Sequence, residues 1–132
     1  MPDNKAIVQS LYAAFGRGDT PFILASLDET ADWISGPARA SIPWSGSRKG
    51  RAGALEFVQH LAGHLDFELF EPRLFAADGD LVFVQGRTVA KVKSTGRRFD
   101  SEWTHAFTFS NGKLKRFQEF YDTIAIAAAL PA

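Results

Sequence analysis

Two runs of alternating apolar and polar residues flank Ser110-Asn111-Gly112 near the C-terminal end of the chain. Asn-Gly is the pair that a type I′ turn favours, because both central residues of that turn need a positive φ. The pattern predicts a β-hairpin over residues 103–122. Strict alternation from this turn places five cross-strand pairs on one face of the hairpin: Phe109–Leu114, Phe107–Arg116, His105–Gln118, Trp103–Phe120 and Ser101–Asp122.

The remainder of the chain divides into helical and strand patterns. Apolar residues recur at helical spacing over 4–16 and 51–65, and Thr20-Pro21 starts a short helix between them. A short strand at 31–34 leads into a loop at 36–50, rich in Gly and Pro, which carries Trp44. We expect this loop to fold over an opening, although simple packing of Trp44 on the core is an equally ordinary role.

Alternating segments over 66–76, 81–93 and 99–109 add strands before the final hairpin, and an apolar tail follows at 123–130. The order predicts one domain over 1–132 with an α+β fold. We expect a strongly curved, mainly antiparallel sheet, shaped as a cone-like barrel, with three helices from the N-terminal half closing one side.

A second register follows from the turn at residues 94–98. If Ser94 pairs with Arg98, Arg87 lies opposite His105, and Gln85 lies opposite Phe107. Arg87, His105 and Gln118 then form a row across three strands, with Asp122 diagonally beyond. A register change of one residue would turn Arg87 to the other face.

These polar groups suggest proton-transfer chemistry on an apolar wall. Burial raises the pKa of an aspartate toward neutrality, while a neighbouring His or Arg lowers it again. Asp122 is therefore the candidate base, with His105 as oxyanion donor, orienting group or second base, and Arg87 as anion binder or partner of Asp122. The alternative interpretation is that the same residues form a buried network of structural contacts and catalyse no reaction. Tyr12 on the first helix is a further candidate, because its hydroxyl could donate into the pocket, although an ordinary core role explains it equally well. The residues expected to contact the substrate are Gln85, Gln118, Trp33, Trp44, Trp103 and Phe120.

Charge and composition narrow the classes of function. Fifteen basic and fifteen acidic residues cancel, which argues against general affinity for nucleic acid or an anionic membrane. No apolar run approaches the ~20 residues of a membrane span, and the N-terminus lacks the apolar core of a signal peptide, so we expect a cytoplasmic protein. The chain has no cysteine, and His60 and His64 lack the glutamate of a zincin motif, so we expect neither metal nor cofactor.

The opposite face of the predicted sheet has no helix left to cover it. Alternation assigns to this face small, β-branched, aromatic and charged residues: Val82, Val84, Thr88, Ala90, Glu102, Thr104, Ala106, Thr108, Phe117, Glu119 and Tyr121. We expect a second subunit to cover them, which gives a homodimer through the sheet.

Three segments, Glu102–Phe109, Asn111–Leu114 and Phe120–Thr123, resemble the SnoaL-like branch of the nuclear transport factor 2-like superfamily. The resemblance implies a cone-shaped α+β barrel with an apolar cavity, usually in a homodimer. Its members include ketosteroid isomerases, polyketide cyclases, epoxide hydrolases and non-catalytic proteins. Asp122 resembles the acid/base aspartate of the cyclases and His105 their pocket histidine, while Tyr12 is similar in placement to the oxyanion-hole tyrosine of the isomerases.

The chain also departs from these relatives. Ser35-Gly36 stands where the isomerases carry a general-base aspartate, and their second acidic donor falls near Thr104. Trp103-Thr104-His105 replaces the Arg-x-Asp of the epoxide hydrolases.

The residues and the resemblance together predict a cofactor-free isomerase or polyketide cyclase-like enzyme. It would move a proton next to a carbonyl of a small hydrophobic, ring-type substrate. The alternative is a non-catalytic module of the same fold that binds a small ligand or a protein. An enclosed pocket of at least a few hundred Å³, on the order of known ligand sites, with Asp122 and His105 exposed to it, would favour catalysis or ligand binding, and a filled cone would favour an interaction module.

Overall fold

The computed structural model describes residues 3–132 and contains four helices and six strands. None of the helices in this range is long and apolar enough to cross a membrane. In chain order the elements are α1 (Asn4–Gly16), α2 (Thr20–Ala25), β1 (Leu27–Ser35), β2 (Gly46–Lys49), α3 (Gly50–His64), β3 (Leu65–Asp78), β4 (Leu81–Val92), β5 (Arg98–Ser110), β6 (Lys113–Tyr121) and α4 (Thr123–Ala129).

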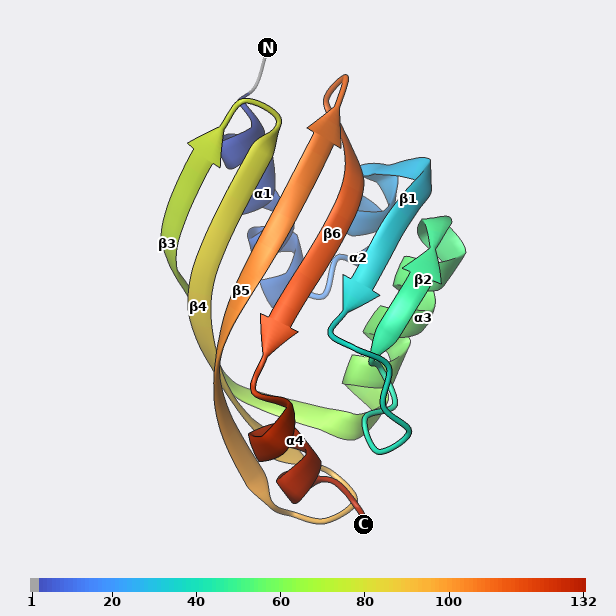
Figure 1. The fold of residues 1–132 in the computed structure, drawn as a ribbon, viewed down its shortest axis with the longest axis vertical. Coiled ribbons are helices and arrows are strands. Elements are labelled where there is room, and N and C mark those ends of the chain that lie inside the picture. The colour runs from blue at the N-terminus through green and yellow to red at the C-terminus, as the bar shows by residue number, and fades with distance from the viewer. Residues whose placement is uncertain (1–2) are drawn as a thin grey trace.

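The six strands form one curved sheet in the order β2-β1-β6-β5-β4-β3. Neighbours are antiparallel except β1 and β6, which run parallel. Figure 1 shows α1, α2 and α3 together behind the sheet, with α4 at the lower end beside the bend of β4 and β5. The expected α+β fold is confirmed, but the sheet is open, because the edge strands β2 and β3 do not pair with each other.

Helix α1 presents its apolar stripe to the sheet. Val8 and Leu11 are buried on this stripe, and the Asp3 side chain caps the helix by accepting a hydrogen bond from the Ala6 backbone N–H at 2.7 Å. A cap of this kind satisfies one of the free N–H groups of the first turn. The stripe also turns Tyr12 toward the strands, which matters for the site.

The predicted turn between β5 and β6 is confirmed. Asn111 and Gly112 have φ values of 51° and 76°, and Ser110 pairs with Lys113 and Phe109 with Leu114. Beyond these two pairs a β-bulge begins, because Thr108 pairs with Arg116 and Lys115 has no opposite residue. One extra residue on one strand turns every later side chain of that strand to the other face.

The predicted pairs beyond the bulge are therefore wrong. His105 lies opposite Glu119 instead of Gln118, and Trp103 opposite Tyr121 instead of Phe120. The physical reason is burial: Leu114 and Phe117 are both buried, although they are three residues apart. Without the bulge, strict alternation from Leu114 would turn Arg116 toward the core and Phe117 toward solvent. Burial of an unpaired guanidinium would cost free energy, so the bulge gives the more stable arrangement.

The predicted register between β4 and β5 is also wrong. Lys91 pairs with Arg98, so the connecting loop is longer than the three residues that a Ser94–Arg98 pair leaves. His105 consequently lies opposite Val84, and Arg87 pairs with Glu102 on the face away from the helices. The shift of three residues is odd, so it reverses the orientation of every side chain on β4 relative to the prediction.

This reversal changes the composition of the outer face. Five of the residues expected there are buried on the inner face: Val82, Val84, Thr88, Ala90 and Phe117. The exposed outer positions include Leu74, Phe83 and Phe120. Thr104, Ala106 and Thr108 remain on the outer side of β5, because their alternation partners Trp103, His105 and Phe107 are buried.

Strand β2 lies within the segment expected to be a loop. It pairs with β1 through Asp32–Lys49 and Ser35–Gly46. The remaining loop folds back onto the core, where Trp44 is buried, so it covers the interior rather than extending into solvent. The Arg48 guanidinium fixes this loop by donating hydrogen bonds to the backbone carbonyls of Trp44 at 2.7 Å and Pro43 at 3.2 Å.

Candidate active site

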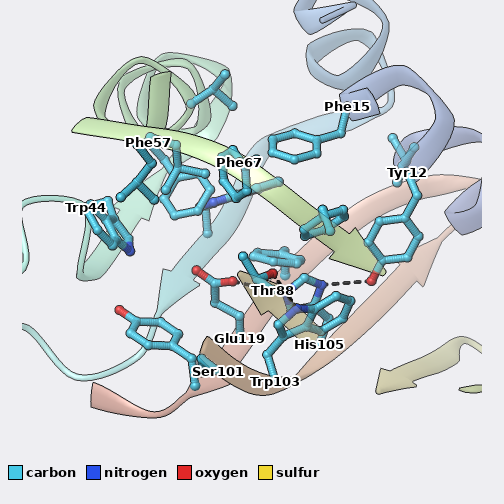
Figure 2. A pocket seen from close by; sticks show the side chains of 18 of the residues that line it. Tyr12, Phe15, Trp44, Phe57, Phe67, Thr88, Ser101, Trp103, His105 and Glu119 are labelled. Carbon is cyan, nitrogen blue, oxygen red and sulfur yellow. Dashed lines mark hydrogen bonds and ion pairs between the residues drawn. The ribbon is translucent and has the colours of Figure 1, made fainter. Parts of the chain in front are cut away.

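A pocket of about 120 Å³ lies between the inner face of the sheet and the helices. Its wall is mostly aromatic and aliphatic, and it includes Trp33, Trp44 and Trp103 as the sequence suggests. Figure 2 shows Tyr12 and Phe15 approaching from α1, opposite Phe57 and Trp44. The polar side chains on the wall are few: Tyr12, Thr88, Ser101, His105, Glu119 and Tyr121.

Three polar residues from three elements form a chain of hydrogen bonds along the pocket. The Tyr12 hydroxyl of α1 lies 2.8 Å from His105 Nδ1 on β5, and His105 Nε2 lies 3.0 Å from Glu119 Oε2 on β6. The His105 and Glu119 side chains are only 6% and 14% exposed. Figure 2 shows Tyr12 and Glu119 on opposite sides of the His105 ring, with the carboxylate turned toward the space beside Trp44 and Phe57.

A His105 ring that carries its proton on Nε2 satisfies every contact in this chain. Nε2 then donates to the Glu119 carboxylate, and Nδ1 accepts from the Tyr12 hydroxyl. Hydrogen bonds that run in one direction polarise one another. All the donors therefore lead toward Glu119, which is the anionic end of the chain.

Ser35 fixes the other oxygen of the carboxylate. This residue is fully buried at the end of β1, and its hydroxyl donates to Glu119 Oε1 at 2.5 Å. The parallel register of β1 and β6 places Ser35 directly beside Glu119. Tyr121 completes the arrangement by donating to the Ser35 backbone carbonyl at 3.0 Å. Each carboxylate oxygen thus accepts one hydrogen bond and keeps free lone pairs.

Burial changes the acidity of both tyrosines in the chain. It raises the pKa of Tyr12 far above its ordinary value, and the nearby negative charge of Glu119 adds to the increase. Burial likewise raises the pKa of Tyr121 to about 12, against a hydrogen bond with Ser35 that lowers it. Both hydroxyls therefore stay protonated at neutral pH and act as donors.

The His105 ring is held flat against Trp103. Their ring centroids are 3.9 Å apart with an interplanar angle of 16°, and the Trp103 indole N–H donates to Thr88 Oγ1 at 2.8 Å. Gly86 makes this position possible, because a Cβ at residue 86 would lie 2.4 Å from the Trp103 ring and 2.5 Å from the Glu71 carbonyl oxygen. No other residue fits at such distances without displacing the indole.

Asp122, the base expected from the sequence, does not lie in the pocket. The chain leaves β6 after Tyr121, and the exposed Asp122 caps α4 by accepting a hydrogen bond from the Ala125 backbone N–H at 3.0 Å. The side-chain contact of Asp122 in this structure is the capping bond at the start of α4, and the side chain is not part of the pocket wall.

Four further candidates lie on the outer face for the register reasons given above. Arg87 donates to both carboxylate oxygens of Asp100, at 2.8 and 2.5 Å. Gln85 and Phe120 are exposed, and Gln118 accepts a hydrogen bond from Arg116. None of the four lines the pocket.

Sequence reasoning missed Glu119, Ser35 and Tyr121 as site residues. The signal that could have found them is the three-residue interval between Leu114 and Phe117, which strict alternation cannot bury on one side. A bulge at this interval moves Glu119 and Tyr121 inward. Ser35 could be recognised only after the β1–β6 pairing was known.

No cluster of three or more metal-ligating side chains occurs within residues 3–132. His60 and His64 stack on each other on α3, with ring centroids 5.9 Å apart. Neither lines the pocket that holds His105 and Glu119.

Solved structures define the fold class as nuclear transport factor 2-like. A protein of this class from Burkholderia xenovorans LB400 is 32% identical, with a TM-score of 0.87 over 99% of both chains. TerC, co-crystallized with polyporic acid, is 26% identical, with a TM-score of 0.78 over 92% of this chain and 93% of its own. A candidate polyketide cyclase from Xanthomonas campestris pv. campestris, 21% identical, shares the fold with a TM-score of 0.80 over 94% and 93% of the two chains.

The family assignment follows from the sequence match. The SnoaL-like domain model matches residues 8–117, so the chain belongs to the SnoaL-like family. No curated protein matches the chain.

Proposed function

We propose that this protein is a cofactor-free acid/base enzyme of the isomerase or cyclase type. It moves a proton at a carbon next to the carbonyl of a small hydrophobic molecule. The observation that carries the proposal is the buried Glu119 carboxylate, held by His105 and Ser35 at the wall of an apolar pocket. The co-crystallization of TerC with polyporic acid supports a small organic ligand for this fold.

Glu119 is the base in this proposal. A free lone pair of its carboxylate takes the proton, so the C–H bond breaks, an O–H bond forms, and the electron pair stays on the substrate as an enolate. In a conjugated enolate, return of the proton to another carbon gives an isomer. Attack of the enolate on a second carbonyl forms a C–C bond and closes a ring, and the alkoxide formed there takes the proton back from Glu119. Positioned carboxylates contribute roughly 100- to 10,000-fold to such steps.

Tyr12 stabilises the negative charge that develops on the enolate oxygen, and His105 orients the base. The Tyr12 hydroxyl points at His105 and can turn to an enolate oxygen without losing its proton, because burial keeps its pKa high. His105 keeps Glu119 oriented through Nε2, and the Trp103 ring holds the imidazole in one plane. Donors fixed in a dry pocket stabilise an oxyanion more than they would in water.

One observation favours a second function, a ligand-binding module without turnover. Both nitrogens of His105 and both oxygens of Glu119 already have protein partners. The pocket of about 120 Å³ is smaller than the few hundred Å³ of a typical ligand site, so a ligand that it binds has to be small. A self-satisfied network is what a structural role requires. This alternative predicts binding of small molecules without any proton exchange.

The two functions separate in a proton-exchange assay with cyclohexanone in D₂O. NMR follows the loss of the hydrogens next to its carbonyl. We expect the protein to accelerate this exchange and the variant Glu119→Gln, which keeps the shape but removes the base, to lose at least about 100-fold of the acceleration.

Glu102→Gln is the matched control, because Glu102 lies on the outer face of β5. This variant should retain the wild-type rate. No acceleration by the wild type, or equal rates for wild type and Glu119→Gln, would reject the enzyme in favour of the binding module.

A further inference from the structure

We propose that the pocket selects uncharged molecules about the size of a single six-membered ring and rejects carboxylates of the same shape. This inference names the substrate class of the site just described and so rests on the proposed function. Three features of the wall carry it: its charge, its volume and an unpaired donor.

The wall of the pocket carries an acidic group but neither Lys nor Arg within the described residues. Glu119 is the only carboxylate among the lining residues in the described part of the chain, and no Lys or Arg lines the pocket there. The Arg48 guanidinium is engaged by loop carbonyls and by Glu56 at 2.9 Å, and Arg87 faces outward. An anionic ligand would lose its hydration, gain no Lys or Arg partner and be repelled by Glu119 across a medium of low dielectric constant.

The volume sets the size of the ligand. A buried apolar cavity of about 150 Å³ is known to hold benzene, so about 120 Å³ suits one ring with few substituents. Rigid aromatic contacts limit expansion of this space. Trp33 stacks on Phe117 with ring centroids 4.2 Å apart, and Trp103 is fixed by Gly86 and its bond to Thr88. A fused second ring would have to displace one of these indoles or stay outside the aromatic wall, where it gains no packing contacts.

An unpaired donor defines the polarity of the ligand. The Trp33 indole N–H is buried and has no hydrogen-bond partner within residues 3–132, although Trp33 belongs to the pocket wall. An unmade hydrogen bond of a buried donor is costly. A ligand that brings a carbonyl or hydroxyl oxygen within reach of this N–H would give it a partner, which a hydrocarbon cannot do. The favoured ligand is thus a small neutral ring compound that carries an acceptor oxygen.

Calorimetry with four probes tests the proposal on the full chain. Benzamide and benzoate share shape and differ in charge, while cyclohexanone and 2-decalone differ by one ring. We expect benzamide to bind at least about tenfold more tightly than benzoate, and cyclohexanone to bind where 2-decalone does not.

Glu119→Gln supplies the decisive comparison. Removal of the negative charge should narrow the preference for benzamide over benzoate at least about fivefold, and Glu102→Gln should leave the preference unchanged. The proposal would be overturned if the wild type bound benzamide and benzoate equally, or if Glu119→Gln left the preference unaffected. Tight binding of 2-decalone would also overturn it, as would no binding of benzamide or cyclohexanone at millimolar concentration.

Failure of the selectivity is distinguishable from failure of the enzyme. Selective binding without exchange of cyclohexanone hydrogens removes the proposed enzyme and leaves the selectivity intact. Exchange that depends on Glu119, together with tight benzoate binding, removes the selectivity and leaves the enzyme intact.

Discussion

Glu119 is the residue on which the site depends, and its surroundings determine its role. Ser35 donates a hydrogen bond to one carboxylate oxygen, His105 contacts the other, and the side chain lines the pocket. Both tyrosines of the chain belong to the same group of contacts. Because these two phenols are buried, they report directly on whether the network exists in solution.

Alkaline titration of the phenols should show this burial. A tyrosine whose folded pKa is raised above the unfolded value of 10.0 stabilises the fold below that pH, and the stabilisation is lost as the pH rises through the folded value, about 12 for Tyr121. We expect almost no phenolate absorbance at pH 10.5 in the native protein. In guanidinium chloride both tyrosines should titrate near pH 10.0. A native phenol that is half ionised at pH 10 would contradict the buried network.

Gly86 gives a second residue-level prediction. A methyl group at this position would overlap the Trp103 ring and the Glu71 carbonyl. Gly86→Ala should therefore lower the free energy of unfolding by about 1–3 kcal/mol and change the near-ultraviolet circular dichroism of the indole. Gly63→Ala is the control, because nothing lies within 4 Å of a Cβ there and the residue is helical. Equal effects of both substitutions would show that Gly86 does not position Trp103.

At the scale of elements, β6 illustrates what the sequence reveals and what it conceals. The Asn111-Gly112 turn and helices α1 and α3 could be predicted, because they depend on local residue preferences and spacing. The bulge at Lys115 depends on a competition between strands for the core, which one strand alone does not display. The length of the β4–β5 loop likewise cannot be read from one strand alone. The strands of the sheet could therefore be predicted, but their registers could not, and Arg87, Gln118 and Asp122 were misplaced as site residues.

Helix α4 yields a test of the reassigned Asp122. Its side chain caps the helix, and Asn caps about as well as Asp. Asp122→Ala should cost about 1 kcal/mol of stability in chemical denaturation, whereas Asp122→Asn should cost a few tenths at most. A similar loss in both variants would mean that the charge of Asp122, and not its capping bond, matters to the fold.

At the scale of the whole molecule, the outer face of the sheet is open and uncharged near its centre. Leu74, Gln85, Thr104 and Phe120 form one row across β3, β4, β5 and β6. Leu74 and Phe120 in this row are 65% and 52% exposed. Two copies related by a twofold axis can meet here without opposing like charges. We propose a homodimer through this face.

Mass measurement in solution checks the dimer. The wild type should have twice the chain mass at micromolar concentration, and Thr104→Lys, which brings two like charges together at the axis, should be a monomer. Gln59→Lys on the exposed side of α3 should remain a dimer. A monomeric wild type, or a dimeric Thr104→Lys, would show that this face is not the interface.

We propose that the working carboxylate of this SnoaL-like protein is Glu119 on β6 and not Asp122 at the end of that strand. The most direct measurement compares Glu119→Gln and Asp122→Asn in the cyclohexanone exchange assay. We predict that Asp122→Asn stays within about twofold of the wild-type rate, while Glu119→Gln falls at least about 100-fold. The reverse order of the two variants would show that Asp122, and not Glu119, is the base.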